Sequence, residues 1–437
     1  MTVDVAPGRV PPLSRNRNYH VLWGSQLVSE LVSQLCLIAF PLTVMAATGS
    51  AARMGVVAAV IAAAHMAANV PAGVLVDRYD RKLVMLVCQC VRAVAMASLA
   101  LALFAGHFSL AHLLVVAVAE GLMGAAFDPA EHAALPQVVP ESQLSQAVAT
   151  NTTRRYIATL LGPASAGFLF AVDRMAPFAV AVVLLVASCV VLGFLRLPRA
   201  EPGRASAVEP GAVEPGAVES GAGEPGAGPE RPGMLADGFR WVLGHPVIRP
   251  TLVWLMCCEL FVSALTVIVL ALSGEGGLAP GEVGVMMTGF GAGGLLGAAV
   301  AGRLHAALPA PVVIVGFPWV AAGLTLVLAL VPTGVLTGVL LGGIAFLIPT
   351  AFTTVMTYQL TVAPDELRGR LSGIVGLFAG GAGAVGPLAG GLLMAGGDSH
   401  GSLLTLCGAL AVVAVGTTLT PALRRFPTLA AGAGTPR

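Results

Sequence analysis

Charged and aromatic residues are scarce in this chain of 437 residues. Only 10% of the residues are Asp, Glu, Lys or Arg, whereas soluble domains are about 25% charged, and aromatic residues reach only 5%. The lack of charge excludes an ordinary soluble protein, and the lack of aromatic rings argues against an aromatic cage for an organic cation. The phosphate loop Gly-x-x-x-x-Gly-Lys-Ser/Thr is also missing from the sequence. We therefore expect no ATP hydrolysis, no other enzymatic activity, no cofactor and no metal.

Long apolar segments take up most of the chain. Hydrophobic residues make up 57% of it, and the mean hydropathy is +0.88. A membrane-spanning helix needs about 20 mostly apolar residues. Twelve such segments are present, at about 21–46, 53–75, 83–105, 110–127, 146–171, 176–196, 248–272, 283–303, 311–331, 334–359, 370–395 and 402–423. The sequence therefore predicts an all-α integral membrane protein with twelve transmembrane helices.

Basic residues indicate how the chain lies in the membrane. With a cytoplasmic N-terminus, twenty of the 23 basic residues fall in inner loops and tails, and the outer loops hold only Arg53 and Arg174. The positive-inside rule then places both termini in the cytoplasm. Lys82 is the single lysine, and Ala, Gly and Pro are abundant, as in a GC-rich bacterial genome. We expect a multi-pass protein of a bacterial cytoplasmic membrane, and a net charge of +1 gives no reason to expect nucleic-acid binding.

The chain is built from two similar halves. Gly162-Pro163 recurs 224 residues later as Gly386-Pro387, and Pro140-Glu141 recurs at the same offset as Pro364-Asp365. Transporters are often built from such repeats, with the substrate site where the halves meet. We expect a tail at 1–20, six-helix bundles at 21–196 and 248–423, a linker at 197–247 and a second tail at 424–437. The linker contains EPGAV-type repeats that cannot form a core, and a tether is its simplest role. Residues 234–245 are expected to form a short amphipathic helix before the second bundle.

A charged turn follows the second apolar segment. It reads GVLVDRYDRK at 73–82, and no helix could carry its five charges through hydrocarbon. The turn strongly resembles a loop motif of the major facilitator superfamily, with Asp80 where that family usually has glycine. The motif residues are Gly73, Asp77, Arg78, Arg81 and Lys82. Asn18-Tyr19, Leu22-Trp23, the segment FDPA at 127–130 and the segment PDELRGR at 364–370 are similar to the enterobactin-exporter-like branch of its drug:proton antiporters.

The resemblance implies that this turn is a cytoplasmic gate. Asp77 would lie near the N-terminus of the eleventh span, where a carboxylate is favoured by the helix dipole, and Arg81 would pair with Asp128 at the end of the fourth. These contacts would close the cytoplasmic side and separate when that side opens. The alternative is a simple topological anchor, although an acidic residue adds nothing to anchoring.

Two glycine-proline motifs resemble the antiporter motif of the same family. Glycine allows helices to approach closely and proline bends them, so we expect a tight and pliable helix seam. Close packing alone would also explain the pattern. The residues of this helix-seam motif are Gly162, Pro163, Gly167, Gly386, Pro387, Gly390 and Gly391.

Ionisable residues within predicted spans are the best candidates for a transport site. Glu30, Glu120 and Glu259 would all lie on spans that line the central cavity in the superfamily. A carboxyl removed from water can bind and release a proton near neutral pH, so at least one is expected to carry a coupling proton. Arg92 could instead pair with Glu120, making both structural. The family's usual arginine in the fourth span is replaced by Ala117.

Hydroxyl groups on two spans could complete the cavity. Ser33 lies one helical turn after Glu30, and Thr353 and Thr357 belong to a threonine-rich tenth span that offers neutral polar groups to a substrate. Such threonines often bond only to their own helix carbonyls. The residues proposed for proton coupling or the substrate cavity are Glu30, Glu120, Glu259, Ser33, Thr353 and Thr357.

Together these features predict a secondary active transporter that exports an amphipathic small molecule in exchange for protons by alternating access. Its partners would be the small-molecule substrate, protons and the lipid bilayer, and it would act as a monomer. Uptake of a small solute is one alternative. A membrane sensor or scaffold on the same fold is another, although the chain offers no sizeable soluble domain.

Overall fold

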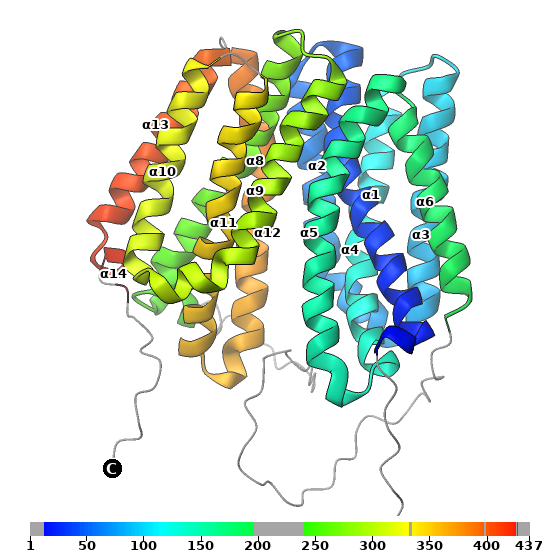
Figure 1. Ribbon diagram of the computed structural model, residues 1–437, viewed down its shortest axis with the longest axis horizontal. Coiled ribbons are helices and arrows are strands. Elements are labelled where there is room, and N and C mark those ends of the chain that lie inside the picture. Colours follow the sequence, from blue (N-terminus) through cyan, green and yellow to red (C-terminus); the bar gives the residue numbers. More distant parts are fainter. Residues whose placement is uncertain (1–12, 196–239, 332–333, 397–398, 425, 427–437) are drawn as a thin grey trace, which may run out of the picture.

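The computed structural model describes residues 13–195, 240–331, 334–396, 399–424 and 426 (Figure 1). Every regular element in these ranges is helical, and twelve helices have 18 residues or more. They are α1 (Arg17–Thr48), α2 (Ala51–Arg78), α3 (Arg81–Phe104), α4 (Leu110–Val138), α5 (Glu141–Val172), α6 (Ala176–Gly193), α8 (Ile248–Glu275), α9 (Pro280–Ala307), α10 (Ala310–Leu330), α11 (Val335–Val362), α12 (Asp365–Gly396) and α13 (Ser399–Leu419). The predicted all-α fold with twelve spans is confirmed.

Eleven of these helices are apolar enough along their length to cross a membrane. The exception is α5, whose first half carries Ser, Gln, Asn, Thr and Arg side chains, so that only Ile157–Val172 forms an apolar run. Helices suit the bilayer because all their backbone hydrogen bonds are made internally. Short polar caps start several of them: Ser50, Asp80 and Ser109 each accept a hydrogen bond from the first turn of the following helix.

Several predicted spans were shorter than the helices of the structure. The fourth span was expected to end at residue 127, but α4 continues through Pro129 and Pro136 to Val138. The predicted linker at 197–247 and its repeats lie largely outside the described residues. Of the helix expected at 234–245, residues 240–244 are helical and the earlier part lies outside the described ranges.

The helices form two groups of six, α1–α6 and α8–α13, which stand side by side in Figure 1. Two helix pairs make most of the contacts between them: α2 packs on α12, and α5 packs on α9. We call the end of the molecule at which α6 ends and α8 begins the linker end, which is the lower end in Figure 1. The opposite end is called the far end.

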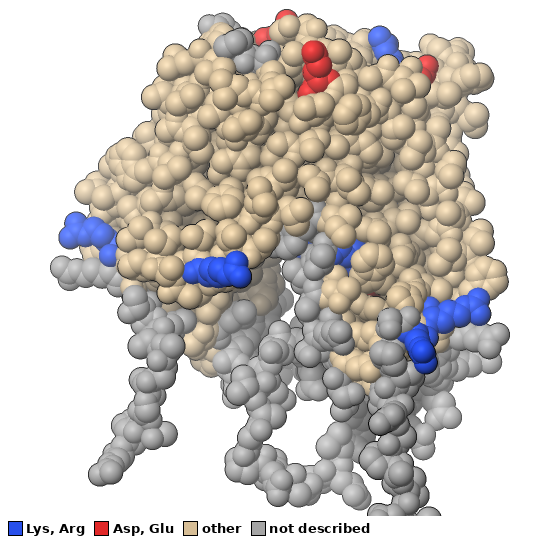
Figure 2. Space-filling model, in the orientation of Figure 1, with Lys and Arg blue, Asp and Glu red and all other residues tan. Residues whose placement is uncertain are grey.

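The halves are joined at the far end and separated at the linker end. One apolar core contains residues of both halves, such as Phe40 and Met54 with Ile268 and Met286. Towards the linker end the core divides into two clusters, one around Met85 and Phe127 and the other around Trp254 and Tyr358. Figure 2 shows the surface hollowed between the halves at this end. The structure is therefore open at the linker end.

Charges on the surface are unevenly placed. On the face in Figure 2, a wide middle band lacks charge, acidic side chains gather at the far end, and most Lys and Arg side chains lie towards the linker end. An uncharged band of this kind is what contact with lipid requires.

Candidate functional site

The most completely bonded polar group in the described interior is the Arg92 guanidinium, which is fully buried. Arg92 of α3 donates to both carboxylate oxygens of Glu120 on α4, from Nε at 2.9 Å and from Nη2 at 2.5 Å. It also donates to the hydroxyls of Ser29 at 2.6 Å and Ser33 at 3.0 Å on α1. This double contact is the strong form of an Arg–carboxylate pair. The structure thus forms the Arg92–Glu120 pair that the sequence allowed.

The network around this pair joins four helices. Ser33 Oγ, which accepts from Arg92, donates to Glu120 Oε1 at 3.1 Å. Gln89 accepts from Arg92 at 3.3 Å and donates to Ser188 of α6 at 3.1 Å. Ala117 of α4 is buried, and the guanidinium in this network belongs to Arg92 on α3. Ser33 and Glu120 are therefore held inside the first half by this network.

Glu30 has a less enclosed environment than Glu120. Its side chain on α1 is 18% exposed, and its Oε1 is 3.6 Å from Nε of Arg155 on α5, which is 61% exposed. Such a half-exposed pair is weaker than a buried one because water screens it. Glu30 is thus an accessible acid with a loose basic partner.

Glu259 has a different environment. It lies in the middle of α8 with an exposed side chain, and no ion pair or hydrogen bond of its carboxylate is found among the described residues. A Cβ at Gly383 of α12 would lie 3.9 Å from Glu259 Oε1, which leaves room beside the carboxylate. Glu259 is therefore the one of the three predicted acids that has no partner in the part of the chain described.

The threonine-rich helix is α11. Thr353 is exposed and Thr357 is half-buried. Thr354 and Thr361 donate to carbonyls one turn earlier on the same helix, and the Thr354 hydroxyl also lies 3.0 Å from Nδ1 of His305 on α9. Thr353 and Thr357 remain candidates for substrate contact.

The charged turn of the predicted gate is anchored within the first half. Asp80 caps α3 by accepting from the Leu83 amide at 3.0 Å, which explains an acidic residue where the family usually has glycine. Arg81 donates to the Ala133 carbonyl of α4 at 2.6 Å. Lys82 donates to the Gly193 and Leu195 carbonyls at 2.8 and 2.7 Å, at the C-terminal end of α6.

Among the described side chains, the other residues of the predicted gate take no part in the hydrogen bonds of Asp80, Arg81 and Lys82. Asp128 accepts from Gln26 of α1 at 3.3 Å, and Arg78 is exposed. A Cβ at Gly73 would meet no atom within 4 Å, and the side chain of Asp77 lies outside the described part of the structure. The proposed contacts of Asp77 and Arg81 belong to a state closed at the linker end, so the gate stays a prediction.

Replacing Lys82 by methionine is expected to lower the stability of the protein in detergent by about 1 kcal/mol, because a cation that caps two terminal carbonyls of α6 is lost. Thermal unfolding of the purified variant measures this. Arg78→Met is the matched control, since Arg78 is exposed and should change stability little. A Lys82→Met protein as stable as the parent would contradict the capping role.

The helix-seam glycines lie at close helix contacts of two kinds. Within the halves, Gly162 of α5 faces Gln34 and Leu35 of α1, and Gly386 and Gly390 of α12 face α8. Between the halves, Gly167 of α5 faces Gly284 of α9, and Gly391 of α12 faces Gly55 of α2. The two contacts between halves are equivalent in the repeat, and they join the molecule towards its far end.

A buried ion pair at the linker end was missed in the sequence. Glu131 of α4 and Arg154 of α5 have side chains only 1% and 2% exposed, and Arg154 Nη1 is 3.6 Å from Glu131 Oε1. Glu131 went unnoticed because the fourth span was expected to end before it. The signal that could have revealed it was an acidic residue five positions before another proline, inside an uninterrupted helical pattern.

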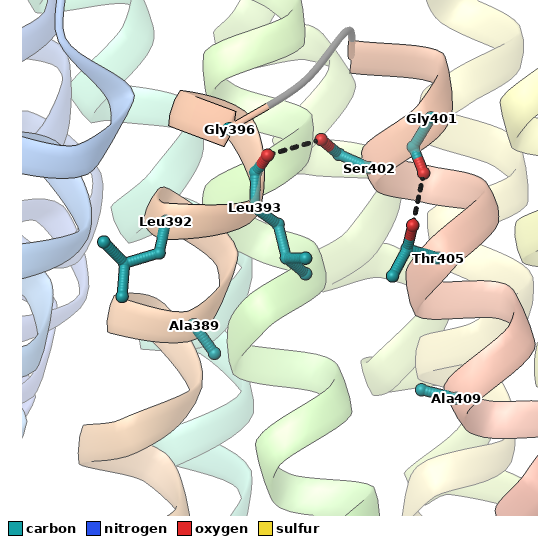
Figure 3. A pocket seen from close by; sticks show the side chains of 8 residues that line it. All are labelled: Ala389, Leu392, Leu393, Gly396, Gly401, Ser402, Thr405 and Ala409. Atoms are coloured by element: carbon teal, nitrogen blue, oxygen red, sulfur yellow. Dashed lines mark hydrogen bonds between the residues drawn. The ribbon is translucent and has the colours of Figure 1, made fainter.

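Two cavities lie between helices of the second half. The larger, of about 720 Å³, lies between α12 and α13 (Figure 3). Ser402 and Thr405 on its wall donate to the Leu393 and Gly401 carbonyls, so its hydroxyls are already used. The smaller, of about 290 Å³, is lined by apolar residues of α8 and α12 that include Met256 and Leu260, close in sequence to Glu259.

Comparison with known proteins agrees with this architecture. Residues 22–270, more than half of the chain, match the family model described as Major Facilitator Superfamily. The chain is 28% identical over 183 residues to Macrolide efflux protein A of Streptococcus pyogenes, a match that covers 41% of this chain and 45% of that protein. It is 29% identical over 128 residues to the protein of the same name from Enterococcus faecalis, covering 29% of this chain and 40% of that protein. The matches thus span less than half the length of these relatives.

Solved structures show the same fold at low identity. A crystal structure of the nucleoside transporter NupG superposes with a TM-score of 0.71 at 10% identity, covering 91% of this chain and 98% of that one. A bacterial homologue of the human lysosomal transporter Spinster, in an inward-facing and unoccupied conformation, gives 0.64 at 13% identity and covers 94% and 96%.

Proposed function

The chain belongs to the Major Facilitator Superfamily, and on this basis we propose that it is a proton-coupled exporter of amphipathic small molecules. Membership makes it a membrane transporter of small molecules and not an enzyme. The direction of transport is supported by the relatives named as macrolide efflux proteins, of which the chain matches less than half.

Glu259 is the observation that carries the proposal. An ionisable residue in the middle of a membrane-spanning helix is costly unless it has a function, and Glu259 has no partner among the described residues to explain its place. A single carboxylate there can hold either a proton or the positive charge of a substrate. The proton and the substrate cation compete for the same carboxylate. A proton that arrives from one side of the membrane therefore displaces a cation that was bound from the other side, and the result is exchange.

The open end fits the first step of export. With the linker end at the cytoplasm, as the distribution of basic residues predicts, the structure is open to the side from which an exporter takes its substrate. The basic side chains towards this end in Figure 2 support that orientation. Glu30, which is partly exposed beside Arg155, would be a second acid that could take up a proton.

Glu259→Gln is expected to reduce substrate-driven proton flux about tenfold or more, because the loss of one charge-assisted contact in a low dielectric is worth roughly 1.5 to 3 kcal/mol. The assay uses purified protein in liposomes that carry a pH-sensitive dye. A macrolide and a panel of amphipathic amines are added on one side under an imposed proton gradient.

Glu275→Gln is the matched control, because Glu275 is exposed at the far end of the same helix. Flux in the parent and in Glu275→Gln that disappears in Glu259→Gln supports the proposal. Binding of the compounds to the parent without any proton flux would reject proton coupling and favour a facilitator or a sensor.

A further inference from the structure

Two buried Glu–Arg pairs in the first half are bonded very differently. In the Arg92–Glu120 pair, both carboxylate oxygens receive hydrogen bonds from the guanidinium. In the Glu131–Arg154 pair, neither oxygen of Glu131 has a hydrogen bond among the described residues, and Nε of Arg154 has none either. The closest approach of the charges is 3.6 Å. Removing the charge from Glu131 therefore breaks no hydrogen bond of that carboxylate, whereas doing so at Glu120 breaks several.

Glu131 belongs to a cluster of charged side chains. Arg154 interacts with Glu131, Glu30 and Asp128, while the only other arginine that acts on Glu30 or Arg154 is Arg155. The three carboxylates of Glu131, Glu30 and Asp128 thus surround the guanidinium groups of Arg154 and Arg155. The other groups near Glu131 are Tyr19 of α1, His132 of α4 and Arg81 of α3, which is engaged by the Ala133 carbonyl.

His132 connects the buried carboxylate to water. Its ring is 58% exposed, and its Nδ1 lies 3.5 Å from Glu131 Oε2 and 2.8 Å from the Asp128 carbonyl oxygen. Proton transfer between Glu131 and Nδ1 would require a rotation of this ring that closes the remaining distance. Glu131 also lies seven residues before the end of α4, which corresponds to about 10 Å from the linker end.

We infer that Glu131 is a second proton-binding carboxyl, which exchanges its proton with water at the linker end through His132 and thereby couples protonation to closure of that end. This inference rests on the proposed proton-coupled transport. The acid that it assigns was outside every span and every site predicted from the sequence.

Release of the proton proceeds in two steps. The O–H bond of the protonated Glu131 breaks, and an N–H bond forms at Nδ1 of the neutral His132 ring. The imidazolium then loses its Nε2 proton to water. The ring is left with hydrogen on Nδ1, which is the tautomer required by the contact with the Asp128 carbonyl, because a carbonyl oxygen can only accept.

Closure of the linker end favours the protonated form of Glu131. When the halves meet there, His132 and the surrounding charges leave water, and burial favours the neutral form of a carboxyl. Protonation of Glu131 therefore favours the state closed at the linker end, and Arg154 keeps Glu30 and Asp128 as negative neighbours. Low pH should close the linker end, and high pH should open it.

The test measures the width of the linker end against pH without substrate. Labels for distance measurement are placed through genetically encoded unnatural residues at Tyr79 of the first half and Leu308 of the second, which are both exposed at this end. The parent should shift towards shorter distances as the pH falls from 8 to 5. Glu131→Gln, which is neutral at every pH, should show the short distance throughout. Glu275→Gln should behave as the parent does.

His132→Asn provides a variant on the surface that does not disturb the interior. It should keep the pH dependence of the distance but slow the approach to equilibrium after a pH jump by about tenfold or more, since a positioned proton-transfer group contributes at least that much. A parent whose distance ignores pH, or a Glu131→Gln protein that follows pH as the parent does, overturns the inference.

Failure of the proposed function and failure of this inference give different results. A parent that changes its linker-end distance with pH but gives no substrate-driven proton flux would reject proton-coupled export while keeping Glu131 as a proton-binding group. A parent with normal flux that Glu131→Gln leaves unchanged overturns only the role of Glu131 in coupling.

Discussion

Replacing Glu120 by glutamine is expected to lower the free energy of unfolding by about 3 to 5 kcal/mol, because it leaves the Arg92 charge buried without a counter-ion. Arg92 is fully buried, and its guanidinium reaches Glu120, two serines and Gln89. Glutamine keeps the shape of the side chain but can accept at only one oxygen. Thermal or denaturant unfolding of the purified variant in detergent measures the loss.

The double variant Arg92→Met with Glu120→Met separates a buried charge from simple packing. Apolar pairs of similar volume often replace buried ion pairs at little cost, so the double variant should be more stable than Glu120→Gln alone. Ser29 and Ser33 can then bond to carbonyls of their own helix. The loss of unfolding free energy in the double variant is compared with the sum of the losses in Arg92→Met and Glu120→Met. If the double variant loses as much as this sum, the ion pair is not the cause of the destabilisation.

Much of this architecture could be predicted from the sequence because its signals are local. Long apolar runs define spans, the repeated Gly-Pro pairs define the two halves, and the turn at 73–82 carries the resemblance to a known family. The Arg92–Glu120 pair was foreseeable for a similar reason: the two residues lie on consecutive spans at matching depth, and a buried charge needs a partner.

Other features depend on contacts that leave no trace in the sequence. Lys82 binds backbone carbonyls at the end of α6, and any residue can supply such carbonyls. Glu131 was missed because Asp128 and Pro129 were interpreted as the end of the fourth span. Proline is tolerated inside a membrane helix where neighbouring helices satisfy the freed carbonyl, and α4 continues past two of them.

The glycine seams show the same limit. The motif predicts close packing, but not which glycine faces which helix. Gly162 and Gly386 face helices of their own half, whereas Gly167 and Gly391, only five positions further along, face the other half. Only the three-dimensional arrangement separates the glycines that build each half from those that join the halves.

Gly391→Val is expected to hold the far end open and reduce transport about tenfold or more, since overpacking costs roughly 1 to 3 kcal/mol and 1.4 kcal/mol changes a ratio tenfold. A Cβ at Gly391 would lie 2.6 Å from the Ala51 carbonyl oxygen and 3.0 Å from the Gly55 Cα. Both are backbone atoms of α2, which cannot yield as a flexible side chain would. This contact between α12 and α2 forms only when the far end is closed. The substitution therefore destabilises the state closed at the far end and leaves the state open at that end unaffected.

The measurement pairs transport with a distance across the far end, using labels at residues 53 and 275, which lie on the two halves and are exposed. The distance should lengthen in Gly391→Val and in the repeat-equivalent variant Gly167→Val, because Gly167 meets Gly284 in the same way. Gly373→Ala is the control within α12, since a Cβ there meets no atom within 4 Å. Because an unfolded protein would lose both states, a variant that is merely unstable fails to bind substrate at all. A well-folded Gly391→Val protein with an unchanged far-end distance would show that the seam does not control closure.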